Sequence, residues 1–343
     1  MSDIKTIKPL DLSRMDLVTD QTVKWCPGCG DYSILKQAQR VMPELGVPRE
    51  NFLFISGIGC SSRFPYYMNT YGFHTIHGRA AAIASGAKLA NLDLSVWVVT
   101  GDGDALSIGG NHTIHLLRRN LDINILLFNN RIYGLTKGQY SPTSELGKVT
   151  KSTPMGSLDR PFNPTSLALG SQATFVARTI DRNPKHIQSI LRSAYEHKGT
   201  SFVEIYQNCN IFNDGAYENL TNKELASDNI IELEHGQPML FGKNHNLGIH
   251  PDFNVPKIID LDKDNNVSID DVLIHNEKDI VIASMLSTFT YDEHFPTPIG
   301  IIYAVDAPIY EDLLQDQINL AIEKQGKGDI EALLNSGNTW EVK

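Results

Sequence analysis

The feature that most constrains the fold is a regular alternation of strand-like and helix-like segments between residues 51 and 128. Three short runs are continuously apolar, as in strands buried on both faces: residues 51–56, 94–100 and 123–128. Between them, residues 79–92 and 107–120 have the apolar spacing of helices. Strands and helices that alternate in this way form a mostly parallel sheet covered by helices on both faces. The sequence therefore predicts an α/β fold.

The remaining segments are expected to flank this core. Residues 134–164 are rich in Gly, Ser, Thr and Pro, and such a loop far exceeds the ~4–6 residues typical of connections, which indicates a function. A helix over residues 185–197 and a strand over residues 201–206 continue the pattern, and helical spacing returns near residues 311–324 and 329–335. We expect three parts: an N-terminal arm (1–20), a main domain (21–215) and a C-terminal extension (216–343).

Charge and hydropathy exclude two classes of partner. Acidic residues outnumber basic ones by 40 to 30, and no cluster of Lys and Arg offers a phosphate-binding patch, which argues against nucleic acid. No run approaches the ~20 apolar residues needed to cross a bilayer. Residues 1–20 lack the apolar core of a signal peptide, so we expect a cytoplasmic protein. Cytosolic reductants would keep the four cysteines from forming disulfides, so the cysteines need another explanation.

Polar side chains follow two of the predicted strands. Asp102 lies in a Gly-Asp-Gly-Asp sequence directly after one strand, and Asn130 follows the next. Ligands bind at the carboxyl edge of an open parallel sheet, where these two side chains should converge. Carboxylate and amide oxygens suit Mg²⁺, which commonly shares its coordination with a diphosphate. Gly-Asp-Gly alone could be only a turn, but in this context it predicts a cofactor site resembling the thiamine diphosphate motif.

The second constellation uses every cysteine of the chain. Cys26 and Cys29 form a Cys-x-x-Cys pair, and Cys60 and Cys209 stand alone. Four thiolates can ligate a [4Fe–4S] cluster or a structural zinc ion. A thioredoxin-like pair with two buried core thiols is the alternative. A zinc site usually has a second close pair, and a redox pair would follow a strand, so the cluster is favoured.

Five separated motifs, in order, resemble the β subunit of the 2-oxoacid:ferredoxin oxidoreductases. They are WCPGCG at 25–30, GIGCSSR at 57–63, HGRA at 77–80, GDGD at 101–104 with GGN at 109–111, and YGLT at 133–136 with QYSPT at 139–143. The resemblance is dense from about residue 20 to 215 and thins afterwards, where PTPIG at 296–300 is its clearest trace. The chain length and residues 63–67 look most like the branch that uses 2-oxoglutarate.

The resemblance implies the thiamine-diphosphate-binding fold and three cofactors: thiamine diphosphate, Mg²⁺ and a [4Fe–4S] cluster. It implies that the cluster is ligated by all four cysteines: Cys26, Cys29, Cys60 and Cys209. It implies that Mg²⁺ is held by Asp102, Asn130 and the carbonyl oxygen of Ile132. Thiamine diphosphate would be lined by Ile58, Gly59, Cys60, Ser61, His77, Gly103, Asp104, Gly134 and Leu135.

Three residues are candidates for catalytic roles. By the resemblance, Leu135 would prop the bent cofactor so that its amino group meets its own C2. Arg63 is placed to bind a substrate carboxylate, which a guanidinium can do bidentately, and Lys137 is a weaker candidate. A surface ion pair is the alternative role for Arg63. His77 could instead be a core histidine satisfied by the backbone.

Thiamine diphosphate together with an iron–sulfur cluster implies oxidative decarboxylation of a 2-oxoacid. A non-oxidative decarboxylase needs no electron acceptor, whereas a cluster accepts single electrons and suits formation of an acyl group captured by coenzyme A. The resemblance predicts 2-oxoglutarate as substrate, with an α subunit and ferredoxin as partners. Pyruvate or another 2-oxoacid, a non-catalytic electron-transfer subunit and a decarboxylase with a zinc-stabilised fold remain alternatives.

Overall fold

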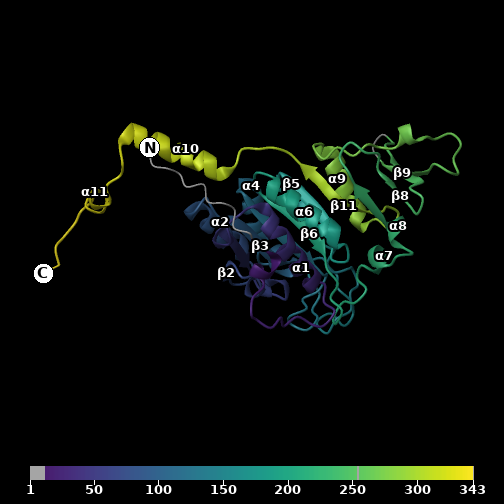
Figure 1. Ribbon diagram of the computed structural model, residues 1–343, viewed down its shortest axis with the longest axis horizontal. Coiled ribbons are helices and arrows are strands. Elements are labelled where there is room, and N and C mark those ends of the chain that lie inside the picture. The colour runs from purple at the N-terminus through teal and green to yellow at the C-terminus, as the bar shows by residue number, and fades with distance from the viewer. Residues whose placement is uncertain (1–11, 253–254, 343) are drawn as a thin grey trace.

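The computed structural model describes residues 12–252 and 255–342, and its body is built on one eight-stranded sheet (Figure 1). The strand order is β2-β1-β3-β4-β6-β5-β11-β7. The strands are β1 (Phe52–Ser56), β2 (Tyr71–His74), β3 (Ser95–Gly101), β4 (Ile123–Asn129), β5 (Phe175–Ile180), β6 (Ser201–Tyr206), β7 (Ile230–Leu233) and β11 (Thr297–Ala304). All neighbours are parallel except β11 and β5, which are antiparallel. The predicted mostly parallel sheet is confirmed.

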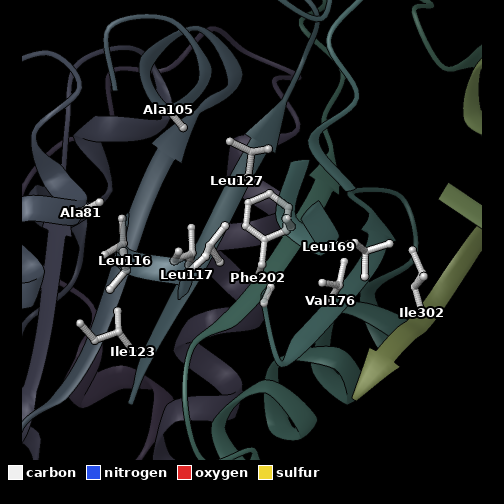
Figure 2. Close-up of a cluster of buried hydrophobic side chains, with 14 of the residues drawn as sticks. Ala81, Ala105, Leu116, Leu117, Ile123, Leu127, Leu169, Val176, Phe202 and Ile302 are labelled. Carbon is white, nitrogen blue, oxygen red and sulfur yellow. The ribbon is translucent and has the colours of Figure 1, made fainter. Parts of the chain in front are cut away.

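Helices cover both faces of this sheet, because each inner strand presents apolar side chains to both sides. In β1, Leu53 and Ile55 join one buried cluster, whereas Phe52 and Phe54 join the other. The first cluster, part of which is drawn in Figure 2, also contains side chains from helices α2 (Ala80–Ala90), α4 (Gly110–Arg119), α5 (Pro164–Gly170) and α9 (Ile280–Thr288). The second contains side chains from α1 (Asp31–Val41) and α6 (Pro184–Glu196).

One predicted helix begins at the wrong residue. The helix expected over residues 107–120 corresponds to α4, which begins three residues later, at Gly110; a separate short helix, α3 (Asp102–Leu106), precedes it, and a turn at Ser107 lies between the two. Asp102 and Asp104 therefore lie in the first turn of a helix, where acidic side chains are favoured by the unpaired backbone N–H groups. The other predicted strands and helices agree with the structure to within about two residues. The structure adds α1, α5, β2 and β5, which the sequence pattern did not indicate.

The predicted N-terminal arm contains a short helix. Residues 1–11 lie outside the described residues, but Arg14–Leu17 form a short 3₁₀ helix, η1. Its Leu17 is fully buried in the second cluster, which fastens the arm to the body. Further 3₁₀ helices are η2 (Met42–Leu45), η3 (Arg49–Asn51), η4 (Ser61–Tyr67), η5 (Ile269–Asp271) and η6 (Phe289–Tyr291).

The C-terminal extension completes the main sheet before it leaves the body. Strands β7 and β11 extend the sheet beyond β5, so residues on both sides of position 215 share one sheet. Two short helices, α7 (Glu218–Thr221) and α8 (Ala226–Asn229), begin the extension. A small antiparallel sheet has the strand order β10-β9-β8 and consists of β8 (Leu240–Phe241), β9 (Leu247–His250) and β10 (Lys257–Asp260). Helices α10 (Tyr310–Gln325) and α11 (Ile330–Leu334) then run away from the sheet, as Figure 1 shows. Within the described residues, no helix combines the length and apolar character that crossing a membrane requires.

Candidate active site

A cavity of about 510 Å³ opens at the carboxyl edge of the sheet, where the chain leaves β1, β3 and β4. Its size lies within the range of small-molecule and cofactor pockets. Every residue predicted to bind thiamine diphosphate or Mg²⁺ lines this cavity. The lining also includes Tyr133, Gln139 and Tyr140 from the start of the long loop. The structure thus brings together residues that are up to 82 positions apart in the sequence, from Ile58 to Tyr140.

The carboxylate of Asp104 organises one wall of the cavity. Its Oδ1 accepts hydrogen bonds from the backbone N–H of Ile58 (3.1 Å) and of Gly78 (2.7 Å), and lies 2.6 Å from Nδ1 of His77. Its Oδ2 accepts from the hydroxyl of Thr100 at 2.7 Å. Asp104 is almost fully buried, so its side chain ties the turns after β1 and β2 to α3. His77 is thereby oriented, and its side chain stays 40% exposed.

Asp102 lies beside Asp104 but is held by the long loop. Its Oδ2 accepts hydrogen bonds from the hydroxyls of Ser141 and Thr143, both at 2.5 Å. Burial raises the pKa of Asp102 to about 6, against the opposing effect of these hydrogen bonds. A carboxylate whose pKa is raised by burial is stabilised in its charged form by a nearby positive charge, which a divalent cation would supply. Asp102 is therefore well suited to be a ligand of a cation.

Asn130 and Ile132 form a turn at the end of β4. The Oδ1 atom of Asn130 accepts from the backbone N–H of Ile132 at 3.2 Å, while its Nδ2 donates to Gln207 Oε1 at 2.9 Å. Between them, Arg131 has φ 56°, a conformation that residues with a side chain rarely adopt. The turn places Asn130 and Ile132 on the cavity wall together with Asp102. Carboxylate, amide and carbonyl oxygens are the donor set that Mg²⁺ prefers.

A series of buried hydrogen bonds connects this turn to the centre of the sheet. The hydroxyl oxygen of Thr143 lies within hydrogen-bonding distance of both Asp102 Oδ2 and Asn129 Oδ1, the latter at 2.9 Å. Its single proton is donated to one of these two acceptors at a time. Asn129 Nδ2 then donates to Glu204 Oε1 at 2.8 Å, and Glu204 pairs with Arg178 at 2.8 Å. Asn129, Glu204 and Arg178 are at most 1% exposed. Asp102, the candidate Mg²⁺ ligand, is thus connected by hydrogen bonds to the buried ion pair of Glu204 and Arg178 in the middle of the sheet.

The four cysteines come from three segments that meet next to the cavity. A Cβ atom at Gly134 would lie 3.5 Å from Cys209 Sγ and 3.6 Å from Cys60 Sγ, so both sulfurs face the same point. Burial raises the pKa of the Cys60 thiol to about 12, with further contributions from the Asp31 carboxylate, Cys209 and Cys26. Burial, and after it the Asp31 carboxylate, also raises the pKa of Cys29. Cys60 and Cys209 thus converge beside the cavity, and thiolates are the ligands that an iron–sulfur cluster requires.

Hydrogen bonds fasten these segments to one another. The indole N–H of Trp25 donates to the carbonyl of Cys60 at 2.6 Å, and Asn210 Nδ2 donates to the carbonyl of Pro27 at 2.6 Å. The backbone N–H of Gly30 donates to the carbonyl of Asn208 at 3.2 Å. Among the residues that the structure describes, no three His, Cys, Asp or Glu side chains are grouped to hold a single metal ion.

The candidate catalytic residues occupy different places. Leu135 lines the cavity and is 42% exposed, as an apolar side chain that contacts a bound ligand would be. Arg63 is half-buried in η4, and its backbone N–H donates to the Cys60 carbonyl, but it lies outside the cavity lining. Lys137 is exposed at the tip of the turn between Tyr133 and Gln139, also outside the lining. The roles of Arg63 and Lys137 stay predictions.

Several residues of the site were not assigned from the sequence. Ser141 and Thr143 stand within the QYSPT motif at 139–143, so their place was marked but their bond to Asp102 was not foreseen. Gln207 and Asn213 had no such signal. Asn213 Nδ2 donates to the carbonyl of Asn130 at 2.9 Å, while its backbone pairs with Cys209. Contacts of this kind depend on how the segments fold together, which spacing along the chain does not reveal.

Comparisons with known proteins identify the family of this chain. Residues 57–205, which include most of the cavity lining, match the family model of the thiamine pyrophosphate enzyme C-terminal TPP binding domain. The chain is 53% identical over 334 residues to 2-oxoglutarate oxidoreductase subunit KorB of Mycobacterium tuberculosis, covering 95% of this chain and 88% of that protein. It is 45% identical over 210 residues to 2-oxoacid:ferredoxin oxidoreductase 1, subunit beta, of Aeropyrum pernix, covering 61% and 64% of the two chains.

A solved structure shows the same fold. The 2-oxoglutarate:ferredoxin oxidoreductase from Magnetococcus marinus, with 2-oxoglutarate, coenzyme A and succinyl-CoA bound, superposes with a TM-score of 0.74 and 31% sequence identity. The match covers 96% of this chain and 97% of that one. The predicted thiamine-diphosphate-binding fold and the predicted family are both confirmed. The chain belongs to the β subunits of the 2-oxoacid:ferredoxin oxidoreductases, in the 2-oxoglutarate oxidoreductase branch.

Proposed function

We propose that this chain is the cofactor-binding β subunit of a 2-oxoglutarate:ferredoxin oxidoreductase, which forms succinyl-CoA and CO₂ from 2-oxoglutarate and coenzyme A. The observation that carries the proposal is the meeting of two constellations at one cavity. Asp102, Asn130 and Ile132 lie on its wall together with Cys60 and Gly134, and a Cβ atom at Gly134 would lie 3.5 Å from Cys209 Sγ. The relatives of this chain are named for 2-oxoglutarate or for 2-oxoacids.

Thiamine diphosphate is the cofactor that we assign to the cavity. When bound, it supplies a nucleophilic carbon and an electron sink for decarboxylation of a 2-oxoacid. Asp102, Asn130 and the carbonyl of Ile132 would hold the Mg²⁺ that binds its diphosphate. The backbone at Gly59 has a φ of +135°, and no atom would lie within 4 Å of a Cβ added there, so a ligand has room to approach. Leu135 would set the cofactor's position by contact.

His77 is a proton-bearing group on the cavity wall. Asp104 holds its Nδ1, and that contact favours a proton on Nδ1. Nε2 is then the nitrogen available to accept a hydrogen bond or a proton from a ligand in the cavity. Since Asp104 is buried and bonded by three other donors, it cannot turn away to free the ring. His77 is therefore oriented before any ligand binds.

The cysteines are the reason for proposing an oxidative reaction. We assign Cys26, Cys29, Cys60 and Cys209 as the ligands of a [4Fe–4S] cluster, which accepts one electron at a time. Two electrons per turnover would leave through it to ferredoxin. In this family the group that activates the aminopyrimidine ring is expected on an α subunit, which we propose as the partner that completes the site in the cytoplasm.

The decisive experiment is anaerobic reconstitution of the chain with its α subunit. Iron, sulfide and thiamine diphosphate content are measured first, and then coenzyme-A-dependent reduction of a low-potential dye with 2-oxoglutarate or with pyruvate. We expect four irons per chain and reduction with 2-oxoglutarate. Reduction with pyruvate alone would contradict the substrate and keep the chemistry. No reduction with either by a fully loaded complex would contradict the catalytic function, and zinc in place of iron would contradict the cluster.

A further inference from the structure

The side chain of Gln207 contacts both candidate cofactor sites. Its Nε2 donates to Cys29 Sγ at 3.3 Å, and its Oε1 accepts from Asn130 Nδ2 at 2.9 Å. Cys29 is a proposed cluster ligand, and Asn130 is a proposed Mg²⁺ ligand. One buried amide, 1% exposed, therefore joins a ligand of each site.

The orientation of this amide is fixed by a partner that can only accept. Gln207 Nε2 also donates to the carbonyl oxygen of Asn208, so the nitrogen must lie on that side. Its Oε1 then faces Asn130, which must present Nδ2 in return. The other atom of Asn130, Oδ1, is consequently directed to the backbone N–H of Ile132, an obligate donor that agrees with this assignment. Each step follows from the hydrogen-bonding capacity of the groups.

The backbone of Gln207 is equally fixed. Gln207 directly follows β6, and its N–H donates to the carbonyl of Asn129 at 3.0 Å, which prolongs the pairing of β6 with β4. Its side chain is packed against Gly30, where a Cβ atom would lie 3.0 Å from Gln207 Cγ. The amide thus has little freedom to turn toward other partners.

We propose that Gln207 is a positioning residue that serves the cluster and the Mg²⁺ site at once; this inference rests on the proposed function. Its Oε1 keeps Asn130 turned so that Oδ1, which has a second lone pair, is available to the cation. Its N–H group donates to the Cys29 thiolate, and hydrogen bonds to cluster sulfurs stabilise the reduced cluster and raise its reduction potential.

Two variants separate the two contacts in the reconstituted α/β complex. Gln207→Met removes both, whereas Gln207→Glu keeps an acceptor for Asn130 and removes the donor to Cys29. Gln39→Met is the matched control, because Gln39 is also buried, at 3% exposed, and its Nε2 donates to the carbonyl of Tyr67 at 3.0 Å. The readouts are the cluster potential, from an absorbance-monitored redox titration, and the Mg²⁺ concentration for half-maximal thiamine diphosphate binding, from calorimetry.

We expect Gln207→Met to raise the required Mg²⁺ concentration about tenfold and to shift the cluster's reduced-to-oxidised ratio about tenfold toward oxidised, which is about 59 mV for one electron. Gln207→Glu should lower the potential and leave the Mg²⁺ requirement near that of the wild type. Values for Gln207→Met no different from those for Gln39→Met would overturn the inference. If Gln207→Met does not fold, an unchanged potential in Gln207→Glu overturns it. A wild-type complex without iron or thiamine diphosphate would instead contradict the proposed function.

Discussion

The hydroxyl of Thr143 lies 2.5 Å from Oδ2 of Asp102, although 41 residues separate them along the chain. Thr143 belongs to the long loop after β4, and Asp102 begins α3 after β3. The loop therefore closes over a carboxylate at the sheet edge and fixes it through hydroxyl groups. This contact explains why so long a loop is ordered close to the cavity, and it leads to the first prediction.

Replacing Thr143 with Val should weaken Mg²⁺-dependent binding of thiamine diphosphate about tenfold or more. The substitution keeps the size but removes the donor to Asp102 and Asn129, and a hydrogen bond to a charged group contributes about 1.5–3 kcal/mol. Calorimetric titration at several Mg²⁺ concentrations measures the effect. Thr143→Ser keeps the hydroxyl and should bind almost as the wild type does. Equal binding by both variants would show that the hydroxyl does not position Asp102.

Adding side-chain volume at Gly134 should prevent cluster assembly. The Cβ of an added side chain would point between Cys60 and Cys209, into the space that we assign to the cluster. We expect Gly134→Val to fold with wild-type circular dichroism but to retain far less than four irons per chain after anaerobic reconstitution. Gly147→Val is the comparison, since nothing lies within 4 Å of a Cβ there, although its φ of +80° adds backbone strain. Full iron content in Gly134→Val would place the cluster elsewhere.

The sequence predicted the site better than it predicted the order of the sheet. Continuous apolar runs identify β1, β3 and β4, and the rule for parallel sheets then places Asp102 and Asn130 at one edge. Strand β5 was missed because Arg178 interrupts its apolar pattern. That charge is tolerated only because it pairs with Glu204 from the neighbouring strand, at 2.8 Å.

Two other features depend on contacts that no local pattern encodes. Strand β11 enters the sheet between β5 and β7, although it follows β5 by more than a hundred residues along the chain, and only packing can decide this position. The short helix that begins at Asp102 was not predicted, because Gly101 and Gly103 suggested a turn there. In the structure Gly103 is part of this helix, and its lack of a side chain lets the ring of Tyr133 pack against it, since a Cβ there would lie 2.2 Å from that ring.

His275, which is buried in its neutral form, should contribute a loss of stability below neutral pH. Burial lowers the pKa of His275, outweighing its hydrogen bond to the Ile301 carbonyl at 2.8 Å. Its other ring nitrogen, Nδ1, is buried without a partner among the described residues. As the pH falls below the ordinary histidine pKa of about 6.5, the unfolded chain takes up a proton that the folded chain resists. The stability that neutral, buried His275 contributes is therefore fully present above about pH 6.5 and declines below it.

Urea titrations at pH 7.5 and 5.5 measure this decline. One such histidine contributes at most about 1.4 kcal/mol per pH unit in that range. His275→Gln should make the pH dependence shallower, even if it lowers stability at pH 7.5. His294→Gln removes a histidine whose side chain is 90% exposed and should leave the slope as it is. Identical slopes in the two variants would remove His275 as a source of the acid sensitivity.

Arg63 should distinguish dicarboxylate from monocarboxylate substrates. It lies three residues after Cys60 in η4, half-buried and close enough to lower the pKa of the Cys60 thiol by its charge, although burial outweighs that effect. Because 2-oxoglutarate has a distal carboxylate that pyruvate lacks, a guanidinium that binds it contributes to one substrate only. We expect Arg63→Ala to raise KM for 2-oxoglutarate at least tenfold and to change KM for pyruvate little. Arg49→Ala, which removes an exposed arginine in η3, is the control for lost surface charge. Equal losses on both substrates would assign Arg63 to the neighbourhood of the cluster and leave selection of the substrate to other residues.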